Sequence, residues 1–357
     1  MSDDVIDNYD LDNNVLFVRG CNLIDIADAN RYLQNAWFAL TGSLVNEEQM
    51  NRLIQSANSE LKQTDPVTKI KAMHQLINAL PSLTLMQRFM MLLSQVEVSA
   101  AQRKVMVPIN ADDCLKIILL MPWIISLARS SEPFFDVPAI ENCKTFEHDF
   151  WLALTGKAAS SGLEDESHCR FMSLLLGGFG TVTPTTTTIR FIASTKSDVI
   201  SALIGGFCAT GPAHMGACKY AIMRLSSVID DVEKGNIDAA TNHYCKDKPW
   251  PGFGHPIMRN DVRVDFFFSR FHMLMRPFSA LARAISDNSG LQPNVDFLIA
   301  SVMSAQRVAP ELGLLAFFVC RMPILLAHYQ ARFSAHSFGL SSEDLREKYK
   351  KVPQSWL

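Results

Sequence analysis

The sequence predicts an all-α protein with one short β-hairpin near its start. Apolar residues recur at three- and four-residue steps between positions 46 and 62, which is the spacing of a helix with one buried face. Similar stripes occupy residues 82–98, 147–155, 196–209, 218–233, 263–287 and 312–333. Apolar and polar residues alternate over strand length at 14–19, and such alternation is scarce elsewhere.

The stretches between these helices are rich in Gly, Pro, Asn and Asp, which end helices and form turns. They fall at 64–67, 131–138, 156–165, 177–184, 210–212, 246–256 and 287–293. The most apolar run, 114–128, contains Lys116 and Pro122 and is shorter than the ~20 residues that cross a bilayer. This run predicts a core helix, and we expect no membrane contact.

Composition narrows the class of protein. A chain of 357 residues is typical of about two domains and can bury a sizeable core. Its formal net charge of -3 supplies no basic face, which argues against nucleic acid as a partner. The eight cysteines stand singly, without ligand-like spacing, and predict buried free thiols and no metal site. The acidic start, Met-Ser-Asp-Asp, has no leader pattern, so we expect a cytoplasmic protein.

The segment Gly-Pro-Ala-His-Met-Gly-Ala at 211–217 places His214 after a helix break. Gly211 and Pro212 end the apolar helix before them, and 213–222 predicts a new helix whose first turn holds His214. The positive end of a helix disfavours imidazolium, so a neutral His214 would suit a hydrogen bond to an enolate oxygen. A surface or N-cap histidine is the alternative for this segment alone.

The segment Pro-Trp-Pro-Gly-Phe-Gly-His-Pro at 249–256 is too rich in Pro and Gly for regular structure. It predicts a stiff loop that presents His255, although a structural turn with an incidental histidine has the same composition. Downstream, Arg259 and Arg263 offer planar guanidinium groups to a phosphate or carboxylate, or else lie on solvated surface.

Asp296 lies in Pro-Asn-Val-Asp-Phe at 293–297, between Val295 and Phe297. A carboxylate among apolar neighbours is costly unless it has a task or a partner. Such an Asp is expected to have a raised pKa and to suit a general base. As an isolated observation, a helix N-cap explains it more simply.

Taken together, the three segments resemble the citrate synthase family. The family pattern is a Gly-Pro-x-His-Gly-Gly-Ala helix start, a Gly-Phe-Gly-His loop ending in Asp-Pro-Arg, and then Pro-Asn-Val-Asp-Phe. Residues 19–27, Arg-Gly-Cys-Asn-Leu-Ile-Asp-Ile-Ala, are similar to the family's early hairpin. Cys320-Arg321, followed by Ala-His-Tyr at 327–329, is similar to its late Arg-x-x-Gly-x-x-Ala-His helix. The resemblance spans about residues 14–333.

This resemblance implies the all-α citrate synthase fold, in which a small helical domain is inserted into a large one. The large domain is expected at 1–216 and 322–357, and the small domain at 217–321. A homodimer is also implied, with the active site in the cleft between the domains.

The resemblance further implies a condensation of acetyl-CoA, or another short acyl-CoA, with a 2-oxo acid. Asp296 would abstract a proton from the acyl thioester, and His214 would stabilise the enolate. His255 would donate a proton to the ketone oxygen under attack. Hydrolysis of the thioester would then drive the condensation forward.

Three arginines complete the site that the resemblance implies. Arg263 and Arg321 would hold carboxylates of the 2-oxo acid, and the loop with Arg259 would lie near CoA. No metal is implied, and no cofactor besides the acetyl-CoA substrate.

Two groups that bind oxaloacetate in the family have no clear match. The family's Ser-Thr-Ser-Thr-Val-Arg run survives at 185–190, but Gly177 stands where an oxaloacetate-binding His is expected before it. The late Arg-Pro-Arg has no clear counterpart at 334–357, and Arg332 or Arg346 is the candidate substitute. We interpret this as the same reaction on a different 2-oxo acid, such as one with a bulkier distal group or a phosphonate.

Two other segments are more similar to the short citryl-CoA lyase branch, namely 251–257 and 183–187. Lyases of that branch lack the His matched by His214, so its presence favours condensation. Met215 replaces a family Gly, and Val262 replaces the Pro of Asp-Pro-Arg. The alternative functions are cleavage of a citryl-CoA-like thioester and non-catalytic binding of CoA or an acid.

Overall fold

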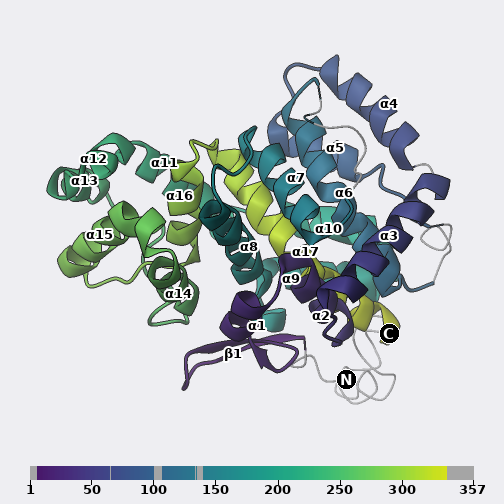
Figure 1. Cartoon of the computed structure of the whole chain (residues 1–357), viewed down its shortest axis with the longest axis horizontal. Helices are drawn as coiled ribbons and strands as arrows, with labels where there is room; N and C mark the ends of the chain where they lie inside the picture. The colour runs from purple at the N-terminus through teal and green to yellow at the C-terminus, as the bar shows by residue number, and fades with distance from the viewer. Residues whose placement is uncertain (1–5, 65, 100–106, 133, 135–139, 336–357) are drawn as a thin grey trace, which may run out of the picture.

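The computed structural model describes residues 6–64, 66–99, 107–132, 134 and 140–335. Packed helices make up nearly all of this chain, and one small sheet lies at the edge of the molecule, beside α1 (Figure 1). The all-α prediction is therefore confirmed. Arg346 lies outside the described residues, and Arg332 is a buried residue near the end of the helix at Pro310–Ser334.

The N-terminal hairpin is present and is extended by a third short strand. Strand β1 (Asp7–Asp10) pairs with β2 (Val15–Val18), and β2 pairs with β3 (Cys21–Asn22), all antiparallel. Buried residues alternate with partly exposed ones along β2, as expected for a half-buried strand. The register pairs Asp7 with Val18, so Asp7 starts the sheet at its buried end.

The helices follow one another through short turns. The first nine are α1 (Leu23–Ala29), α2 (Tyr32–Thr41), α3 (Glu47–Thr64), α4 (Pro66–Asn78), α5 (Leu85–Leu93), α6 (Ala111–Arg129), α7 (Cys143–Thr155), α8 (Gly162–Leu176) and α9 (Pro184–Ser194). They are followed by α10 (Val199–Cys208), α11 (Ala217–Ser226), α12 (Ile229–Lys234), α13 (Ile237–Tyr244), α14 (Val262–Arg270), α15 (His272–Ser289), α16 (Val295–Ala305) and α17 (Pro310–Ser334). A 3-10 turn, η2 (Gly180–Val182), precedes α9.

Helix α17 forms the middle of the core. It packs against α9, α8, α2 and α11, and almost every residue along it is buried. By length and composition α17 is apolar enough to cross a membrane, but its apolar stretch is entirely buried within the protein. This burial identifies α17 as a core helix.

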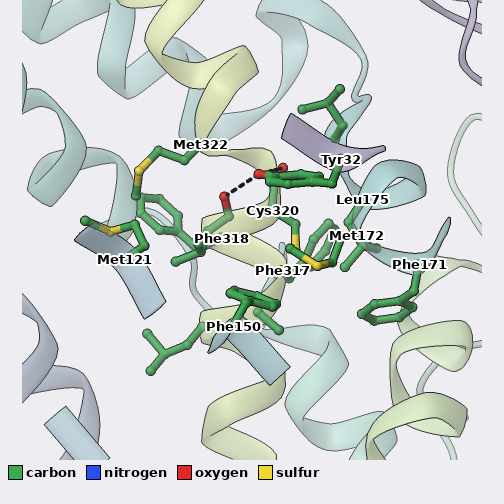
Figure 2. Close-up of a cluster of buried hydrophobic side chains, with 14 of the residues drawn as sticks. Tyr32, Met121, Phe150, Phe171, Met172, Leu175, Phe317, Phe318, Cys320 and Met322 are labelled. Carbon is green, nitrogen blue, oxygen red and sulfur yellow. Dashed lines mark hydrogen bonds between the residues drawn. The ribbon is translucent and has the colours of Figure 1, made fainter. Parts of the chain in front are cut away.

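A proline inside α17 deprives one backbone carbonyl of its helical donor, and Tyr32 supplies a replacement. Pro323 has no N–H, so the carbonyl of Val319, four residues earlier, loses its usual hydrogen bond. The Tyr32 hydroxyl lies 3.3 Å from that carbonyl and 3.1 Å from the carbonyl of Cys320, among buried aromatic rings (Figure 2). This contact ties α2 to the helix that carries Arg321.

Two predicted helices are each divided in two. The stripe at 218–233 is broken between α11 and α12, and the stripe at 263–287 is broken at Phe271. At Phe271 the backbone leaves helical geometry, yet its N–H still donates to Phe267 and its carbonyl accepts from Met275. Because these helical hydrogen bonds continue through Phe271, apolar residues keep their helical spacing on both sides of the bend. Periodicity alone therefore does not reveal the break.

Helices α11 to α16 gather at one end of the molecule (Figure 1). Within this group α11 packs closely against α16, and both contact α17. Gly313 allows the approach of α17 to α11, because a Cβ there would lie 2.2 Å from the Cδ1 atom of Ile222. The division of the chain into domains stays a prediction, and residue 321 lies inside the continuous helix α17.

The cysteines are all free, as predicted, but they are not all buried. Cys208 is exposed, and Cys21 and Cys245 are partly exposed. Cys208 ends α10, where the helix surface turns to solvent.

Candidate active site

Five of the six predicted site residues line one cavity of about 480 Å³. They come from the turn before α11, the loop before α14, the start of α14, the start of α16 and the middle of α17, and are His214, His255, Arg263, Asp296 and Arg321. Arg259 is exposed and is not among the residues that line this cavity. A second cavity of about 520 Å³, beside α10 and the end of α17, contains none of the six.

His214 lies in a turn rather than in a helix, so its predicted place in the first turn of a helix is wrong. The carbonyl of Gly211 accepts hydrogen bonds from the N–H groups of His214, at 2.9 Å, and Gly216, at 3.1 Å. Only after this turn does α11 begin, at Ala217. Glycine is required at 216, because a Cβ there would lie 2.6 Å from the carbonyl of Thr210.

Burial keeps His214 neutral. Its Nε2 atom lies 2.9 Å from the hydroxyl of Thr185, which is buried in the first turn of α9. Burial, together with the positive charge of Arg321, lowers the pKa of His214 to about 4. A neutral imidazole in a cavity can donate a hydrogen bond to a developing oxyanion without first losing a proton. The sequence therefore predicted the direction of this effect, but attributed it to a helix terminus.

His255 has its proton fixed on one nitrogen. Its Nδ1 atom accepts from the backbone N–H of Ile257, at 3.1 Å, and of Met258, at 3.0 Å. Both groups are donors, so Nδ1 carries no proton and the neutral ring carries it on Nε2. Burial, assisted by the charge of Arg263, lowers the pKa of His255. His255 is thus a neutral donor through Nε2.

The loop that carries His255 is fastened to the start of α16. Backbone hydrogen bonds join Gly254 to Gln292, at 2.8 Å, and Asn294 to Gly252, at 2.9 Å. Gly252 has φ +84°, and a Cβ there would lie 2.9 Å from the Cβ of Phe297. The expected stiff loop with close backbone approach is confirmed at this position.

Asn294, which the sequence analysis did not single out, joins the loop to the helix. Its Oδ1 atom accepts from the N–H of Asp296, at 2.9 Å, and so caps α16, while its Nδ2 atom donates to the carbonyl of Gly254. The N-cap interpretation of Asp296 is therefore wrong, because the cap is two residues earlier. An Asn directly before the apolar helix was the available signal.

Asp296 faces the cavity from the first turn of α16. Burial raises its pKa, the charge of Arg263 opposes this rise, Asp261 adds to it and Arg321 opposes it, and the net pKa is about 7. Its carboxylate makes no hydrogen bond with any other described residue. A carboxylate with a pKa near neutrality is a stronger base than an ordinary Asp and still ionises at physiological pH.

The two buried arginines are held differently. Arg263 is bound by Asp261, with Nε–Oδ1 at 2.8 Å and Nη2–Oδ2 at 2.7 Å, and its Nη1 atom is buried without a partner among the described residues. Arg321 donates from Nε to the carbonyl of Leu175, at 3.1 Å, and from Nη2 to that of Gly177, at 2.6 Å. Burial, followed by the charge of Arg263, lowers the pKa of Arg321 to about 9. Each guanidinium therefore has Nη1 left for an anion.

Gly177 does not leave an empty space where a histidine is missing. A Cβ at Gly177 would lie 2.8 Å from the Cδ2 atom of Leu23 in α1, so the residue faces the packed core. The absence of the histidine therefore does not widen the site at this position. Thr183 does line the cavity, and the Thr185 hydroxyl bonds to His214 instead. No three His, Cys, Asp or Glu side chains are grouped as metal ligands in the described part of the chain.

Comparison with known proteins decides the family. The family model for citrate synthase, C-terminal domain, matches residues 5–337. The chain belongs to the citrate synthase family. This confirms the resemblance of the three segments and of the early and late motifs.

Relatives within the citrate synthase family are distant. The 2-methylcitrate synthase 2 of Corynebacterium glutamicum is 28% identical over 191 residues, a match that spans 50% of this chain and 49% of that protein. The citrate/2-methylcitrate synthase of Bacillus subtilis is 23% identical over 338 residues, 90% of this chain and 88% of that protein. At such identities the relatives support a condensing activity at the level of the family.

Solved citrate synthases share the fold. The enzyme from Thermotoga maritima matches with a TM-score of 0.70 and 20% identity, over 95% of this chain and 91% of that chain. The enzyme from Thermoplasma acidophilum, in a ternary complex with carboxymethyl coenzyme A and oxaloacetate, matches with a TM-score of 0.72 and 18% identity, over 94% and 91%.

Proposed function

We propose that this protein condenses acetyl-CoA, or another short acyl-CoA, with a 2-oxo acid and releases free CoA. The observation that supports this most directly is the position of Asp296, a carboxylate with a pKa of about 7, in one cavity with two neutral histidines. Enolate chemistry needs one base and hydrogen-bond donors for two oxygens, and the cavity supplies groups of these kinds.

In the proposed reaction Asp296 takes a proton from the carbon next to the thioester carbonyl, and His214 donates a hydrogen bond to the enolate oxygen. The enolate carbon attacks the ketone carbon of the 2-oxo acid while Nε2 of His255 donates a hydrogen bond to the ketone oxygen. The alkoxide that forms takes up a proton to replace the one that Asp296 removed, so that Asp296 is ionised again. Arg263 and Arg321 hold the acid through their Nη1 atoms. Water then cleaves the thioester, which gives a hydroxy acid with one more carboxylate, CoA thiol and a proton.

The test is release of CoA thiol. Acetyl-CoA and propionyl-CoA are each mixed with a panel of 2-oxo acids that includes oxaloacetate, and free thiol is measured. We expect release only when a suitable acid is present. Absence of release across the whole panel, together with turnover of citryl-CoA without added nucleotide, would support the lyase alternative instead.

A variant pair separates catalysis from binding. Asp296→Asn removes the base and is expected to lower the rate of thiol release by about 10³-fold. Asp230→Asn, which changes a largely exposed carboxylate of α12, is the matched control and should retain the wild-type rate. Equal rates in both variants would favour a non-catalytic binding protein.

We also propose that the protein is a cytoplasmic homodimer. Phe191 of α9 is 75% exposed and Val182, just before α9, is 71% exposed, so apolar surface is available there for a second copy. Light scattering during gel filtration should give twice the mass of the chain. A monomer at micromolar concentration would contradict the assembly.

A further inference from the structure

A buried carboxylate from the first strand supports the back of the cavity. Asp7 of β1 lies under the loop at 177–180, where its Oδ2 atom accepts from the N–H of Gly178, at 3.0 Å, and of Gly180, at 3.2 Å. Its Oδ1 atom lies 2.6 Å from Nε2 of His328 in α17. Both side chains are almost fully buried.

The hydrogen-bond pattern indicates that Asp7 carries its charge. Nη1 of Arg190 lies 3.4 Å from Nδ1 of His328, and an arginine can only donate, so His328 donates its Nε2 proton to Asp7. Burial alone would raise the pKa of Asp7, but the bond from His328 and the N–H group of Gly180 lower it overall. An ionised carboxylate with three donors is therefore a permanent part of this wall.

This negative charge lies next to Arg321. A Cβ built on Gly178 would be 3.0 Å from Oδ2 of Asp7 and 3.3 Å from Nη1 of Arg321, so no side chain fits between the two groups. Arg263 has its own carboxylate in Asp261. Each of the two cavity arginines thus already has a resident carboxylate nearby before any substrate enters.

The same arginines have few nitrogens left for a ligand. Nε and Nη2 of Arg263 are bound to Asp261, and those of Arg321 are bound to the carbonyls of Leu175 and Gly177. The remaining Nη1 atoms provide one nitrogen from each residue. Two single nitrogens suit the two oxygens of one carboxylate, whereas two carboxylates would compete for them.

Strand β1 also places an apolar ring in the cavity. Phe179, in the loop that Asp7 holds, lies with its ring 5.4 Å from the ring of Tyr9 and 5.1 Å from the ring of His255. Met215 and Phe317 line the same cavity. An uncharged group therefore has apolar surface to contact close to His255.

We propose that Asp7 determines the acceptor specificity of this protein, by restricting it to 2-oxo acids with a single carboxylate and an uncharged, apolar distal group. This inference rests on the proposed function. Of the acceptors that the sequence left open, it selects the bulkier distal group over the phosphonate. Asp7 already offsets the positive charge of Arg321. A second negative charge on the acceptor would therefore be repelled by Asp7, and this repulsion would oppose binding.

The experiment compares two acids of nearly the same shape. In 4-methyl-2-oxopentanoate an isopropyl group replaces the distal carboxylate of oxaloacetate. We expect the wild-type protein to prefer 4-methyl-2-oxopentanoate by about 30-fold or more in kcat/KM for thiol release. Equal use of the two acids, or a preference for oxaloacetate, would overturn the proposal.

Asp7→Asn removes the charge and should raise the use of oxaloacetate relative to 4-methyl-2-oxopentanoate by about tenfold. Asp10→Asn, at the exposed end of the same strand where Asp10 accepts from Asn13, is the control and should keep the wild-type ratio. If the role of Asp7 is purely structural, Asp7→Asn should lower kcat/KM equally with both acids. The ratio between the acids would then be unchanged, and this result would overturn the proposal. If Asp7→Asn does not fold, the wild-type ratio decides.

Calorimetric binding of the two acids to the wild-type protein, without CoA, separates this inference from the proposed function. Tighter binding of 4-methyl-2-oxopentanoate without thiol release would support the specificity and refute the condensation. Thiol release together with tighter binding of oxaloacetate would support the condensation and refute the specificity.

Discussion

The two histidines of the cavity are held by two regions built in different ways. The loop with His255 is joined by backbone hydrogen bonds and by Asn294 to the start of α16, which carries Asp296. The turn with His214 is closed on itself through Gly211 and contacts α9 through the Thr185 hydroxyl. A change in the first region should therefore disturb several functional groups together, whereas a change in the second should affect one.

Among the changes that test this difference between the two regions, Asn294→Ala is expected to have the largest effect. This change removes the cap of α16 and the bond to Gly254, so His255 and Asp296 lose their common support. We expect a loss of about 100-fold in kcat, because small misplacements of reacting groups are costly, and about 1 kcal/mol of stability from the lost cap. Steady-state kinetics and urea unfolding measure the two effects.

Asn294→Asp is the matched control for that change. It keeps an oxygen for the cap and loses the donor to Gly254, so it should retain most of the stability and part of the activity. Full activity in Asn294→Ala would show that the two functional groups are positioned independently.

The pH dependence of the rate distinguishes the two regions next. Asp296 must be ionised to act as a base, and its pKa is raised to about 7, so kcat/KM should rise with pH to a plateau. At pH 6 it should lie about tenfold below that plateau. The pKa of His214 is lowered to about 4, so His214 should not titrate between pH 6 and 8, and burial lowers the pKa of His255 as well. A rate that is constant over this window would exclude Asp296 as the base.

Thr185→Val should have a smaller and more local effect. It removes the hydroxyl that bonds to Nε2 of His214, and we expect a loss of about fivefold in kcat, the equivalent of one modest hydrogen bond. Thr185→Ser retains the hydroxyl and should be close to wild type. The pH profile should not move in either variant, and a shifted profile would show that the two regions are coupled.

The effect of Asp296→Asn on stability should have the opposite sign to its effect on activity. The folded pKa of Asp296, about 7, lies above its ordinary value of 3.8, so between these pH values the folded protein keeps a proton that the unfolded chain has lost. Stability contributed by this group is therefore lost as the pH rises from about 4 to 7. Asp296→Asn should be more stable than wild type by about 2 kcal/mol at pH 8 and nearly equal at pH 4. Urea unfolding at both pH values tests this, and lower stability at pH 8 would contradict the assignment.

Local patterns predicted much of this molecule. Helical periodicity identified most long helices, and the three motifs identified five residues that line one cavity. Local spacing does not identify Asn294 as a site residue. One of its two hydrogen bonds caps its own helix, but the other reaches the carbonyl of Gly254, 40 residues earlier. Composition predicts a helix for the turn before α11, because Ala213 and Met215 suit a helix, and the hydrogen bonds to the carbonyl of Gly211 cannot be recognised from composition.

Contacts between the two ends of the chain were beyond local patterns. Asp7 and His328 are 321 positions apart, and no spacing rule connects them. Similarly, the Leu23 side chain beneath Gly177 belongs to a helix far away in sequence, so the packing at Gly177 does not follow from its neighbours along the chain. These features depend on how α1, β1 and α17 meet, which only the assembled core determines.

The hydroxyl of Tyr32 has a consequence for biosynthesis. Helix α17 leaves the ribosome after all the helices that surround it, and the carbonyl that Pro323 leaves unsatisfied is bonded by a residue made about 290 positions earlier. Until α17 arrives, the apolar faces of α2, α8 and α9 lack their common partner and are exposed to solvent. We therefore expect the nascent chain to expose this apolar surface until α17 is made and completes the core late in synthesis.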